Sequence, residues 1–343
     1  MVARVTIADV AREAGVSVAT VDRVVNGRLP VREDTARRVL DASQRLGFHA
    51  AGLIRARLRE QLPEITVGLL LQRPEDPFYR DLTDRLTAAI TGSRLFRGTV
   101  RADFWPADDP EDIAARLRRL GRRARAVAVV SPDHAAVAEA VAELTARGVP
   151  VFTLLSDLAT SARTSHLGID GRKAGRTAAW VIHHAAKAAG PVGVIVGSRR
   201  FQGHELREMG FRSYFREIAP DFPVLEAVVN SESDAATEGA VVQLTEAWPD
   251  LAGIYMAGGG IAGAIAGLHR LAKDRRPALI VPALPPLARA ALADRLLAAA
   301  VCEPIDRLCE RLLDLVVLAL EGETARLPNT ILLPMDLFTP ENL

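Results

Sequence analysis

The chain has 343 residues, of which 49% are hydrophobic and 25% are charged. This length predicts two or three domains and allows sizeable cores. The composition is typical of a globular protein, and no run of about 18 apolar residues is present, which argues against a membrane protein. Cys302 and Cys309 fit neither a disulfide framework nor a zinc site, so we expect both to be reduced core residues.

Charge is distributed unevenly along the chain. Residues 1–60 hold 11 arginines and 7 acidic residues, a net charge of +4, whereas the remainder holds 32 basic and 35 acidic residues, a net charge of −3. A small basic head before a nearly neutral body is typical of a polyanion-binding module joined to a second function. Asp9 and Glu13 interrupt any basic-then-apolar signal peptide, so we expect the protein to stay in the cytoplasm.

The first fifty residues predict three short helices, over residues 7–14, 18–25 and 33–46. Thr6 and Asp9 have the spacing of a capping box, in which a hydroxyl and a carboxylate accept the free backbone N–H groups at a helix start. The inward positions of the three helices are apolar and would share one core. They are Val10, Ala14, Val21, Val24, Val25, Ala36, Val39, Leu40 and Leu46.

The connections between these helices are short. Gly15 suits the left-handed conformation that ends a helix, Ser17 can cap the next helix, and Gly47 ends the third. A tight turn between the first two helices is typical of a helix-turn-helix domain, although an ordinary helical hairpin would share this pattern. The outer face of the second helix carries Val18, Ala19, Asp22, Arg23 and Asn26.

Residues 5–17 and 20–26 closely resemble the heads of LacI/GalR-family bacterial transcriptional regulators. The resemblance implies that the second helix enters the major groove, with Val18, Ala19 and Arg23 facing base edges. Arg23 could pair with guanine through two hydrogen bonds, which discriminates by about 1–3 kcal/mol, whereas the two apolar residues read only shape or thymine methyl groups. The residues implied to lie near phosphates, where they would set register, are Thr6, Ser17, Thr20, Asn26 and Thr35.

One position of the second helix departs from the family pattern. Asp22 stands where many relatives have serine. Its carboxylate would approach the phosphates and weaken binding unless it pairs with Arg23 or Arg12.

The hinge is a second departure. After Phe48 the family commonly has a helix containing Pro-Asn that wedges a leucine into the minor groove, and this chain lacks that dipeptide. Leu53 or Leu58 could be the wedge. A solvated, arginine-rich linker is the alternative. The arginines that would lie against the DNA backbone are Arg55, Arg57 and Arg59.

From residue 64 onward, short apolar runs alternate with helical patterns. This alternation predicts parallel sheets covered by helices on both faces. An interruption over residues 156–166 divides the strands into two groups and predicts two doubly wound lobes. The predicted strands are 66–71, 99–104, 126–130, 149–155, 192–196, 224–228, 252–256 and 278–281, and the helices include 133–146, 172–188 and 204–218.

The family resemblance extends over this body and implies lobes of the periplasmic-binding-protein type, with three chain crossings near residues 163, 294 and 325. The fold class is therefore α/β, with a small all-α helix-turn-helix head before two doubly wound parallel-sheet lobes. The expected parts are a head over residues 1–48, a hinge over 49–63 and a ligand-sensing body over 64–343. In that body the N lobe comprises residues 64–163 and 294–325, and the C lobe comprises 164–293 and 326–343.

Ligands of doubly wound sheets meet the carboxyl ends of the strands, so the residues that follow each strand are the candidates for effector binding. Phe78 or Tyr79 could stack on a sugar ring while carboxylates accept its hydroxyls. Arg207 matches a family arginine that binds ligand hydroxyls or a carboxylate. Taken singly, the other candidates are equally well explained as helix caps or surface residues. The full set is Asp76, Phe78, Tyr79, Ser131, Asp157, Asp170 and Arg207.

Several positions at which sugar-responsive relatives often carry Asn or an acid are different here. This chain has Met256-Ala257, Ala283-Leu284 and Gly171 at those positions. Because each buried hydroxyl partner contributes on the order of 1 kcal/mol, we expect a sugar-related effector with fewer hydroxyls than a hexose.

Enzyme signals are weak. Residues 258–263 match G-x-G-x-x-G after a strand, but no acid follows about 20 residues later to bind a ribose. His204-Glu205 and His183-His184 lack metal-site spacing, and Gly197-Ser198 is not a nucleophile elbow. We therefore expect neither an enzyme nor a cofactor or metal.

Together these features predict a cytoplasmic transcriptional regulator, in the simplest case a repressor, that binds a pseudo-palindromic DNA operator as a homodimer. A small-molecule effector between the lobes would shift the protein between two forms, and whether it releases or recruits DNA stays open. Only nine residues follow Pro334 and they form no apolar heptad, so no tetramer-forming coiled coil is expected. A solute-binding protein without a DNA role and an α/β enzyme are the alternatives.

Overall fold

The computed structural model describes residues 5–26, 31–323 and 326–343. It divides into two compact units, Met1–Ile65 with Thr91–Thr99 and Thr66–Ile90 with Val100–Leu343. Among the described residues, no helix is long and apolar enough to cross a membrane.

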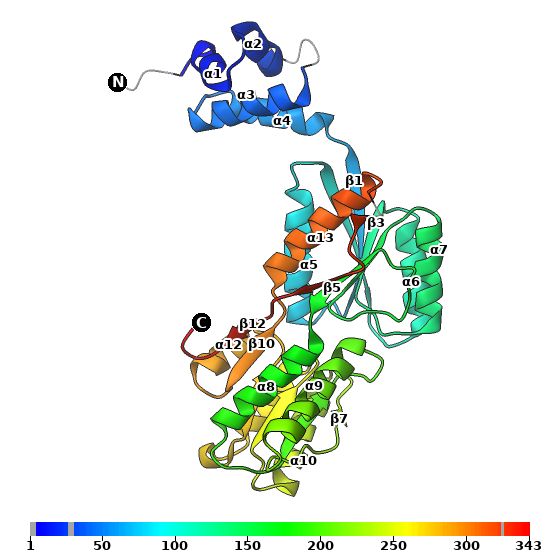
Figure 1. Cartoon of the computed structure of the whole chain (residues 1–343), viewed down its shortest axis with the longest axis vertical. Helices are drawn as coiled ribbons and strands as arrows, with labels where there is room; N and C mark the ends of the chain where they lie inside the picture. The colour runs from blue at the N-terminus through cyan, green and yellow to red at the C-terminus, as the bar shows by residue number, and fades with distance from the viewer. Residues whose placement is uncertain (1–4, 27–30, 324–325) are drawn as a thin grey trace. The chain divides into compact units, whose positions relative to one another are not determined.

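In the part of the head that the structure describes there are four helices, one more than the sequence predicts, and Figure 1 shows them at the N-terminal end of the chain. The expected capping box is present, since the Thr6 hydroxyl accepts the Asp9 N–H at 3.3 Å and Asp9 accepts the Thr6 N–H at 3.0 Å. Gly15 is left-handed, with φ 62°, and ends the first helix as predicted. The helices are α1 (Ile7–Ala14), α2 (Val18–Asn26), α3 (Glu33–Arg45) and α4 (Ala51–Gln61).

The extra helix, α4, forms from the segment expected to be a hinge. It belongs to the head because Ile54 is fully buried in the core of α1–α3 and Leu58 packs against that core. The three predicted helices also bury the residues expected of them, with Leu40 and Leu46 only partly buried at the edge. Packing of one apolar face therefore extends the helical unit beyond residue 48.

The N lobe is built on a six-stranded sheet of order β11-β5-β4-β3-β1-β2. The pairings of β1 with β3, β3 with β4, β4 with β5, and β5 with β11 are parallel. The central strands are buried throughout, as expected for a sheet covered on both faces. Its elements are β1 (Glu64–Gln72), α5 (Pro77–Thr91), β2 (Arg97–Trp105), α6 (Pro110–Gly121), β3 (Ala126–Val129), α7 (Ala135–Ala146), β4 (Val151–Leu154), β5 (Ser165–Ile169), α13 (Ile305–Leu320) and β11 (Thr330–Leu333).

The C lobe repeats this plan with the strand order β12-β10-β9-β8-β6-β7. Only β12, paired with β10, is antiparallel among the described pairings of this sheet. Its elements are α8 (Gly171–Ala185), β6 (Val192–Val196), α9 (Gln202–Ile218), β7 (Val228–Val229), α10 (Asp234–Ala247), β8 (Gly253–Met256), α11 (Ile261–His269), the 3-10 turn Lys273–Arg275, β9 (Ala278–Val281), α12 (Pro286–Ala293), β10 (Ala299–Cys302) and β12 (Asp336–Phe338).

The α/β class and the two parallel-dominated sheets confirm the predicted fold. The strand expected over residues 224–228 is shorter, because only Val228–Val229 and a bridge from Val224 to Val192 pair with β6. Four strands were not predicted: β5, β10, β11 and β12. They have three to five residues each; β5 and β12 contain polar residues, and β10 lies within the alanine-rich run after Leu296, so no isolated apolar run marks these three.

These additional strands place the chain crossings later than expected. The chain leaves the N lobe after β5, returns after β10, and leaves again between β11 and β12. The sequence placed the first two crossings near residues 163 and 294, ahead of β5 and β10. The third expected crossing, near residue 325, lies outside the described residues. Both cysteines are free and buried, as predicted, and burial raises the pKa of each thiol to about 12.

Candidate functional site

The outer face of α2 presents the predicted DNA-reading residues to solvent. Val18 is 52% exposed, and Ala19 and Arg23 are also exposed, while Val21, Val24 and Val25 on the opposite face are buried. Ser17 caps the helix by accepting the Thr20 N–H at 3.1 Å. The predicted phosphate contacts Thr6, Ser17 and Asn26 are exposed, and Thr20 and Thr35 are half-buried. A regular, capped helix therefore presents the face with Val18, Ala19 and Arg23 to solvent.

Asp22 forms neither of the two ion pairs that would offset its effect on phosphate binding. It accepts a hydrogen bond from the Asn26 amide at 2.6 Å, one helical turn away, rather than pairing with Arg23 or Arg12. Arg12 instead lies 3.5 Å from Asp9. The i,i+4 spacing of Asp22 and Asn26 on α2 explains the preference, because side chains four apart meet on a helix face.

The two candidate wedge leucines occupy different environments on α4. Leu53 is 47% exposed, whereas Leu58 packs against the core of the head. Arg57 donates a hydrogen bond to the Val25 carbonyl near the end of α2, so it stabilises the head itself. Arg55 and Arg59 are exposed. Of the two leucines, only Leu53 is free to insert elsewhere.

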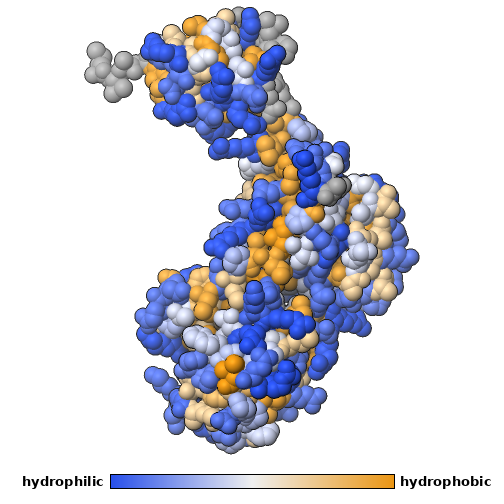
Figure 2. Space-filling model, viewed as in Figure 1, coloured by the Kyte–Doolittle hydropathy of each residue, from blue (hydrophilic) through white to orange (hydrophobic). Residues whose placement is uncertain are grey.

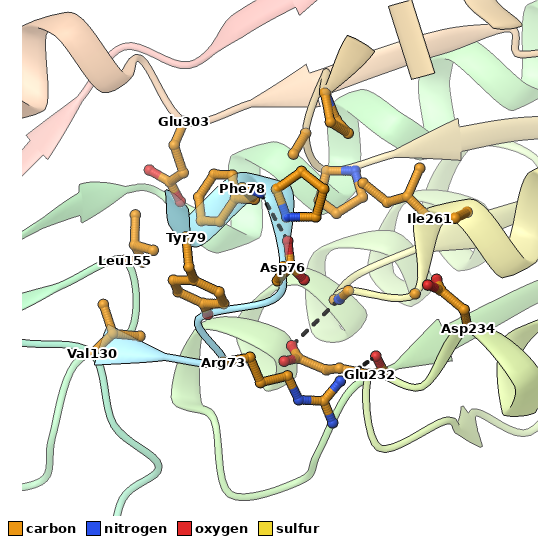
Figure 3. A pocket seen from close by; sticks show the side chains of 18 of the residues that line it. Arg73, Asp76, Phe78, Tyr79, Val130, Leu155, Glu232, Asp234, Ile261 and Glu303 are labelled. Atoms are coloured by element: carbon orange, nitrogen blue, oxygen red, sulfur yellow. Dashed lines mark hydrogen bonds between the residues drawn. The ribbon is translucent and has the colours of Figure 1, made fainter. Parts of the chain in front are cut away.

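The body contains a cavity of about 690 Å³ lined by residues of both lobes. This volume suits a small metabolite, since ligand pockets commonly measure about 300–1,000 Å³. Four of the seven predicted effector residues line it: Asp76, Phe78, Tyr79 and Arg207. Figure 3 shows the Phe78 and Tyr79 rings between the Glu303 side chain and the segment that carries Asp76.

The other three predicted residues do not line this cavity. Ser131 is buried and its hydroxyl donates to the Pro132 carbonyl. Asp157 accepts two hydrogen bonds of 2.5 Å from the Arg163 guanidinium, which holds the loop after β4. Asp170 caps α8 by accepting the Lys173 N–H at 3.1 Å. All three have local structural roles.

Arg207 reaches the cavity because α8 and α9 pack with their backbones nearly touching. A Cβ at Gly175 would lie 1.9 Å from the Arg207 carbonyl oxygen, and one at Gly210 would lie 2.1 Å from the Arg172 carbonyl oxygen. The Arg207 guanidinium donates to the Ala257 carbonyl at 3.0 Å and to Glu303 at 2.8 Å. Its charge is thus already partnered by a carboxylate within the protein.

Glu303 is the most unusual group at the site. It is 5% exposed, and its Oε2 atom has no hydrogen-bond partner among the described residues. Burial raises the pKa of Glu303 to about 7, against the opposing effect of the Arg207 charge. A buried oxygen without a partner is energetically unfavourable, so this atom is available to a ligand donor.

Glu232 is a second buried carboxylate in the lining. It accepts a hydrogen bond from the Gln72 amide and another from the Gly259 N–H at 3.3 Å, while the Tyr79 hydroxyl donates to Gln72 at 2.9 Å. Burial raises the pKa of Glu232. His204 lies 3.6 Å from Glu232, and burial lowers the pKa of His204 to about 3, which leaves the imidazole neutral at pH 7.

Arg73 connects the two lobes beside this network. It follows β1 and donates to the Ser231 and Glu232 carbonyls of the C lobe at 2.5 and 2.6 Å. Arg73, Ser231 and Glu232 all have positive φ, between 39° and 55°. Such conformations are costly for residues other than glycine, and they persist only where the surrounding contacts hold the backbone in place.

Sequence reasoning missed Arg73, His204, Glu232, Asp234 and Glu303, all of which line the cavity. Glu303 directly follows β10, and Glu232 and Asp234 follow β7, so the strand-end rule applies to them. It was not applied to Glu303 because β10 was not predicted, whereas the predicted strand 224–228 ends one residue before β7 does, so the rule could have been applied to Glu232 and Asp234. The sequence signal that could have found these cavity residues was therefore their position directly after a strand, rather than their residue type.

The glycines of residues 258–263 have a packing role. Gly258, Gly259 and Gly260 line the cavity, and Gly260 has φ 90° at the start of α11. A Cβ at Gly263 would lie 1.8 Å from the Asp234 carbonyl oxygen, so α10 and α11 can only approach this closely with glycine there. The described residues also contain no cluster of three side chains suited to hold a metal ion.

These features define a two-lobed binding protein with a helix-turn-helix head. Residues 67–324 match the family described as periplasmic binding protein domain, to which the chain belongs, and residues 6–50 match the bacterial regulatory proteins of the lacI family. Both matches confirm the family resemblance drawn from the sequence.

Relatives and solved structures agree with this assignment. The HTH-type transcriptional regulator MalR of Streptomyces coelicolor is 31% identical over 60% of this chain, which spans only 57% of MalR. Catabolite control protein A of Priestia megaterium is 42% identical over 23% of each chain. A solute-binding protein from Actinobacillus succinogenes with bound D-allose is similar in fold over 81% of this chain and 98% of its own, with a TM-score of 0.74 and 14% identity.

Proposed function

We propose that this protein is a DNA-binding transcriptional regulator of the LacI family, acting in the cytoplasm, most simply as a repressor. The observation that carries the proposal is the exposed face of α2, with Val18, Ala19 and Arg23 outermost on a capped helix-turn-helix. Such a helix fits the major groove, where its side chains reach base edges. The regulators similar to this chain support the same function.

The cavity between the lobes is the proposed effector site. It combines the aromatic residues Phe78 and Tyr79 with hydrogen-bonding groups at Arg207 and Glu303, the mixture of apolar and polar groups that small-molecule sites require. Solute-binding proteins of the same fold carry sugars such as D-allose, and a sugar-related effector is proposed here. By binding one arrangement of the lobes better than the other, the effector would change operator affinity.

The functional form is proposed to be a homodimer. One helix-turn-helix head contacts too few base pairs for useful affinity, and two heads on a pseudo-palindrome solve this. Figure 2 shows apolar residues gathered over α5 and α13, and on α13 Leu313, Val317 and Leu318 are only partly buried in the single chain. Burying such a surface against a second copy would be favourable.

The test is a titration of the protein against DNA taken from upstream of its own gene. The regulator predicts tight binding to one pseudo-palindromic site, weaker binding to either half-site, and binding to random duplex that is weaker still and more salt-sensitive. Equal, salt-sensitive affinity for the best site and for random duplex would refute it. That result would favour a solute-binding protein or an enzyme without a DNA role.

A further inference from the structure

The lining of the effector cavity carries more negative than positive charge. Its five carboxylic acids are Glu75, Asp76, Glu232, Asp234 and Glu303, against the two guanidinium groups of Arg73 and Arg207. His204, the one imidazole among the described lining residues, is neutral at pH 7 because burial lowers its pKa to about 3. An excess of carboxylates in a partly enclosed site is unfavourable unless some of them take up protons, as the raised pKa values of Glu232 and Glu303 favour, or a counter-charge enters.

The two arginines compensate this charge only in part, since the Arg73 charge lowers the pKa of Asp76 and of Glu232 but five acids face two guanidinium groups. Arg207 is paired with Glu303 at 2.8 Å and also donates to the Ala257 carbonyl. Arg73 directs its two terminal nitrogens to the backbone carbonyls of Ser231 and Glu232. The orientation of both guanidinium groups is therefore set by protein acceptors.

Asp76 of the N lobe interacts electrostatically with two acids of the C lobe. Asp76 belongs to the N lobe, whereas Glu232 and Asp234 belong to the C lobe; beside the larger effect of burial, the Asp234 charge raises the pKa of Asp76, and the Asp76 charge raises the pKa of Glu232. Figure 3 shows these three side chains on the same side of the Phe78 ring, with Glu303 beyond the ring. Asp76 and Asp234 accept backbone N–H groups of Phe78 and Gly263 through Oδ1. Like charges on opposing lobes resist closure, and a cation placed between them reverses that effect.

A second observation points to a ligand at the other end of the same cavity. Glu303 is 5% exposed, and its Oε2 atom has no hydrogen-bond partner among the described residues. A donor on the ligand would satisfy this oxygen. The Phe78 and Tyr79 rings and the proline-rich wall of Pro282, Pro285 and Pro286 lie along the cavity and suit an apolar ring.

We propose that the effector is a cationic amine built on a small ring, with its ammonium group between Asp76, Glu232 and Asp234 and a hydrogen-bond donor at Glu303. This inference rests on the proposed effector site and specifies its ligand class. A neutral polyol would use the carboxylates as acceptors but would add no charge to the partial compensation that Arg73 gives. The cation also explains how binding favours lobe closure, because it attracts acids from both lobes.

The test compares isosteric pairs of probes that exchange an ammonium group for a hydroxyl. Isothermal titration of the full chain at neutral pH would use D-glucosamine against D-glucose, and cyclohexylamine against cyclohexanol. We expect at least one amine to bind, and to bind about tenfold more tightly than its hydroxyl partner. Added salt should weaken the amine and not the alcohol. The proposal is overturned if neither amine binds or if the hydroxyl partner binds as tightly as the amine.

Variants test whether the preference comes from this cluster. The double variant Asp76→Asn, Asp234→Asn should abolish the preference for the amine, whereas Asp221→Asn, an exposed acid outside the cavity, should retain it. Thermal unfolding of each variant shows that the fold is intact, and Asp234→Asn alone is the substitute if the double variant unfolds. A preference that survives these changes would contradict the proposal. Operator binding is measured on the same protein without probe, so its loss would count against the regulator and not against this ligand class.

Discussion

Arg23 and the phosphate-facing residues of the head have different chemical capacities. Arg23 is exposed on α2 and has the planar donor pair that guanine O6 and N7 accept together. Thr35 offers one hydroxyl, which serves a phosphate but distinguishes no base. Sequence preference should therefore be concentrated in one side chain of the head.

Replacing Arg23 with Ala should lower affinity for the best operator by about 1–3 kcal/mol and relax preference at one symmetric base pair. Thr35→Ala is the matched control, and it should weaken binding to all sequences alike. Both are measured by fluorescence anisotropy with operators changed one base pair at a time. Equal loss on every sequence for Arg23→Ala would mean that Arg23 contacts phosphate only.

Glu303 makes stability depend on pH in a direction opposite to that of a salt-bridged surface acid. Burial raises the pKa of Glu303 from 4.5 to about 7 in the folded chain. Between these values the folded state binds more protons than the unfolded state, so this group makes the free energy of unfolding fall as pH rises from about 4.5 to about 7.

Glu303→Gln should remove this contribution to the pH dependence, because the amide does not titrate. Urea unfolding at several pH values across the window measures it, with the exposed Glu226→Gln as control. As pH rises across the window, the free energy of unfolding of the wild type should fall relative to that of Glu303→Gln. A difference independent of pH would show that Glu303 titrates normally.

At the scale of elements, α4 is the helix whose role changed most from sequence to structure. From its sequence this segment is expected to be a hinge in which either Leu53 or Leu58 could be the wedge. In the structure, Ile54 and Leu58 lie four residues apart and both contact the core of the head. Leu53 lies on another side and is 47% exposed. The helix therefore has one face for stability and one available for DNA.

These two faces predict opposite phenotypes for the two leucines. Leu58→Ala should destabilise the head by about 1–2 kcal/mol, less than a fully buried leucine because Leu58 is only partly buried. Leu53→Ala should change stability by less than about 0.5 kcal/mol but weaken operator binding. Thermal unfolding and operator titration of both variants separate the two roles. Unchanged operator affinity in Leu53→Ala would exclude it as the minor-groove wedge.

At the scale of the whole molecule, the lobes of the body are connected by Arg73 as well as by the three chain crossings. Its two hydrogen bonds to Ser231 and Glu232 form only when the lobes are together. All three residues have positive φ, a conformation that is costly for residues other than glycine. We therefore expect Arg73 to favour the arrangement in which the lobes are together.

Arg73→Met should shift the ligand-free protein toward the open arrangement, because it removes two charge-assisted hydrogen bonds and keeps the aliphatic stem. Small-angle X-ray scattering should show a larger radius of gyration for the variant. Arg80→Met is the control, since Arg80 donates within its own lobe to the Glu75 carbonyl. Identical scattering from wild type and Arg73→Met would show that Arg73 does not govern closure.

Much of this protein could be predicted from sequence because the relevant forces are local. The Thr6–Asp9 capping box, the left-handed Gly15 and the α2 face with Arg23 each depend on residues within one or two turns. The same holds for Asp76 and the aromatic pair after β1, which follow a long and strongly apolar strand. Local hydrogen bonding and periodicity determine such features before any tertiary contact forms.

Only the tertiary structure decided which side chains share the cavity. Asp76, Glu232 and Glu303 are far apart in sequence, and they meet because short strands such as β10 join the second sheet and direct their ends to one cavity. β10 continues the alanine-rich run after Leu296, so its sequence does not separate it from the preceding helix, and the position of each chain crossing depends on which sheet such a strand joins. The burial that raises the Glu303 pKa arises for the same reason, since it depends on packing contributed by both lobes.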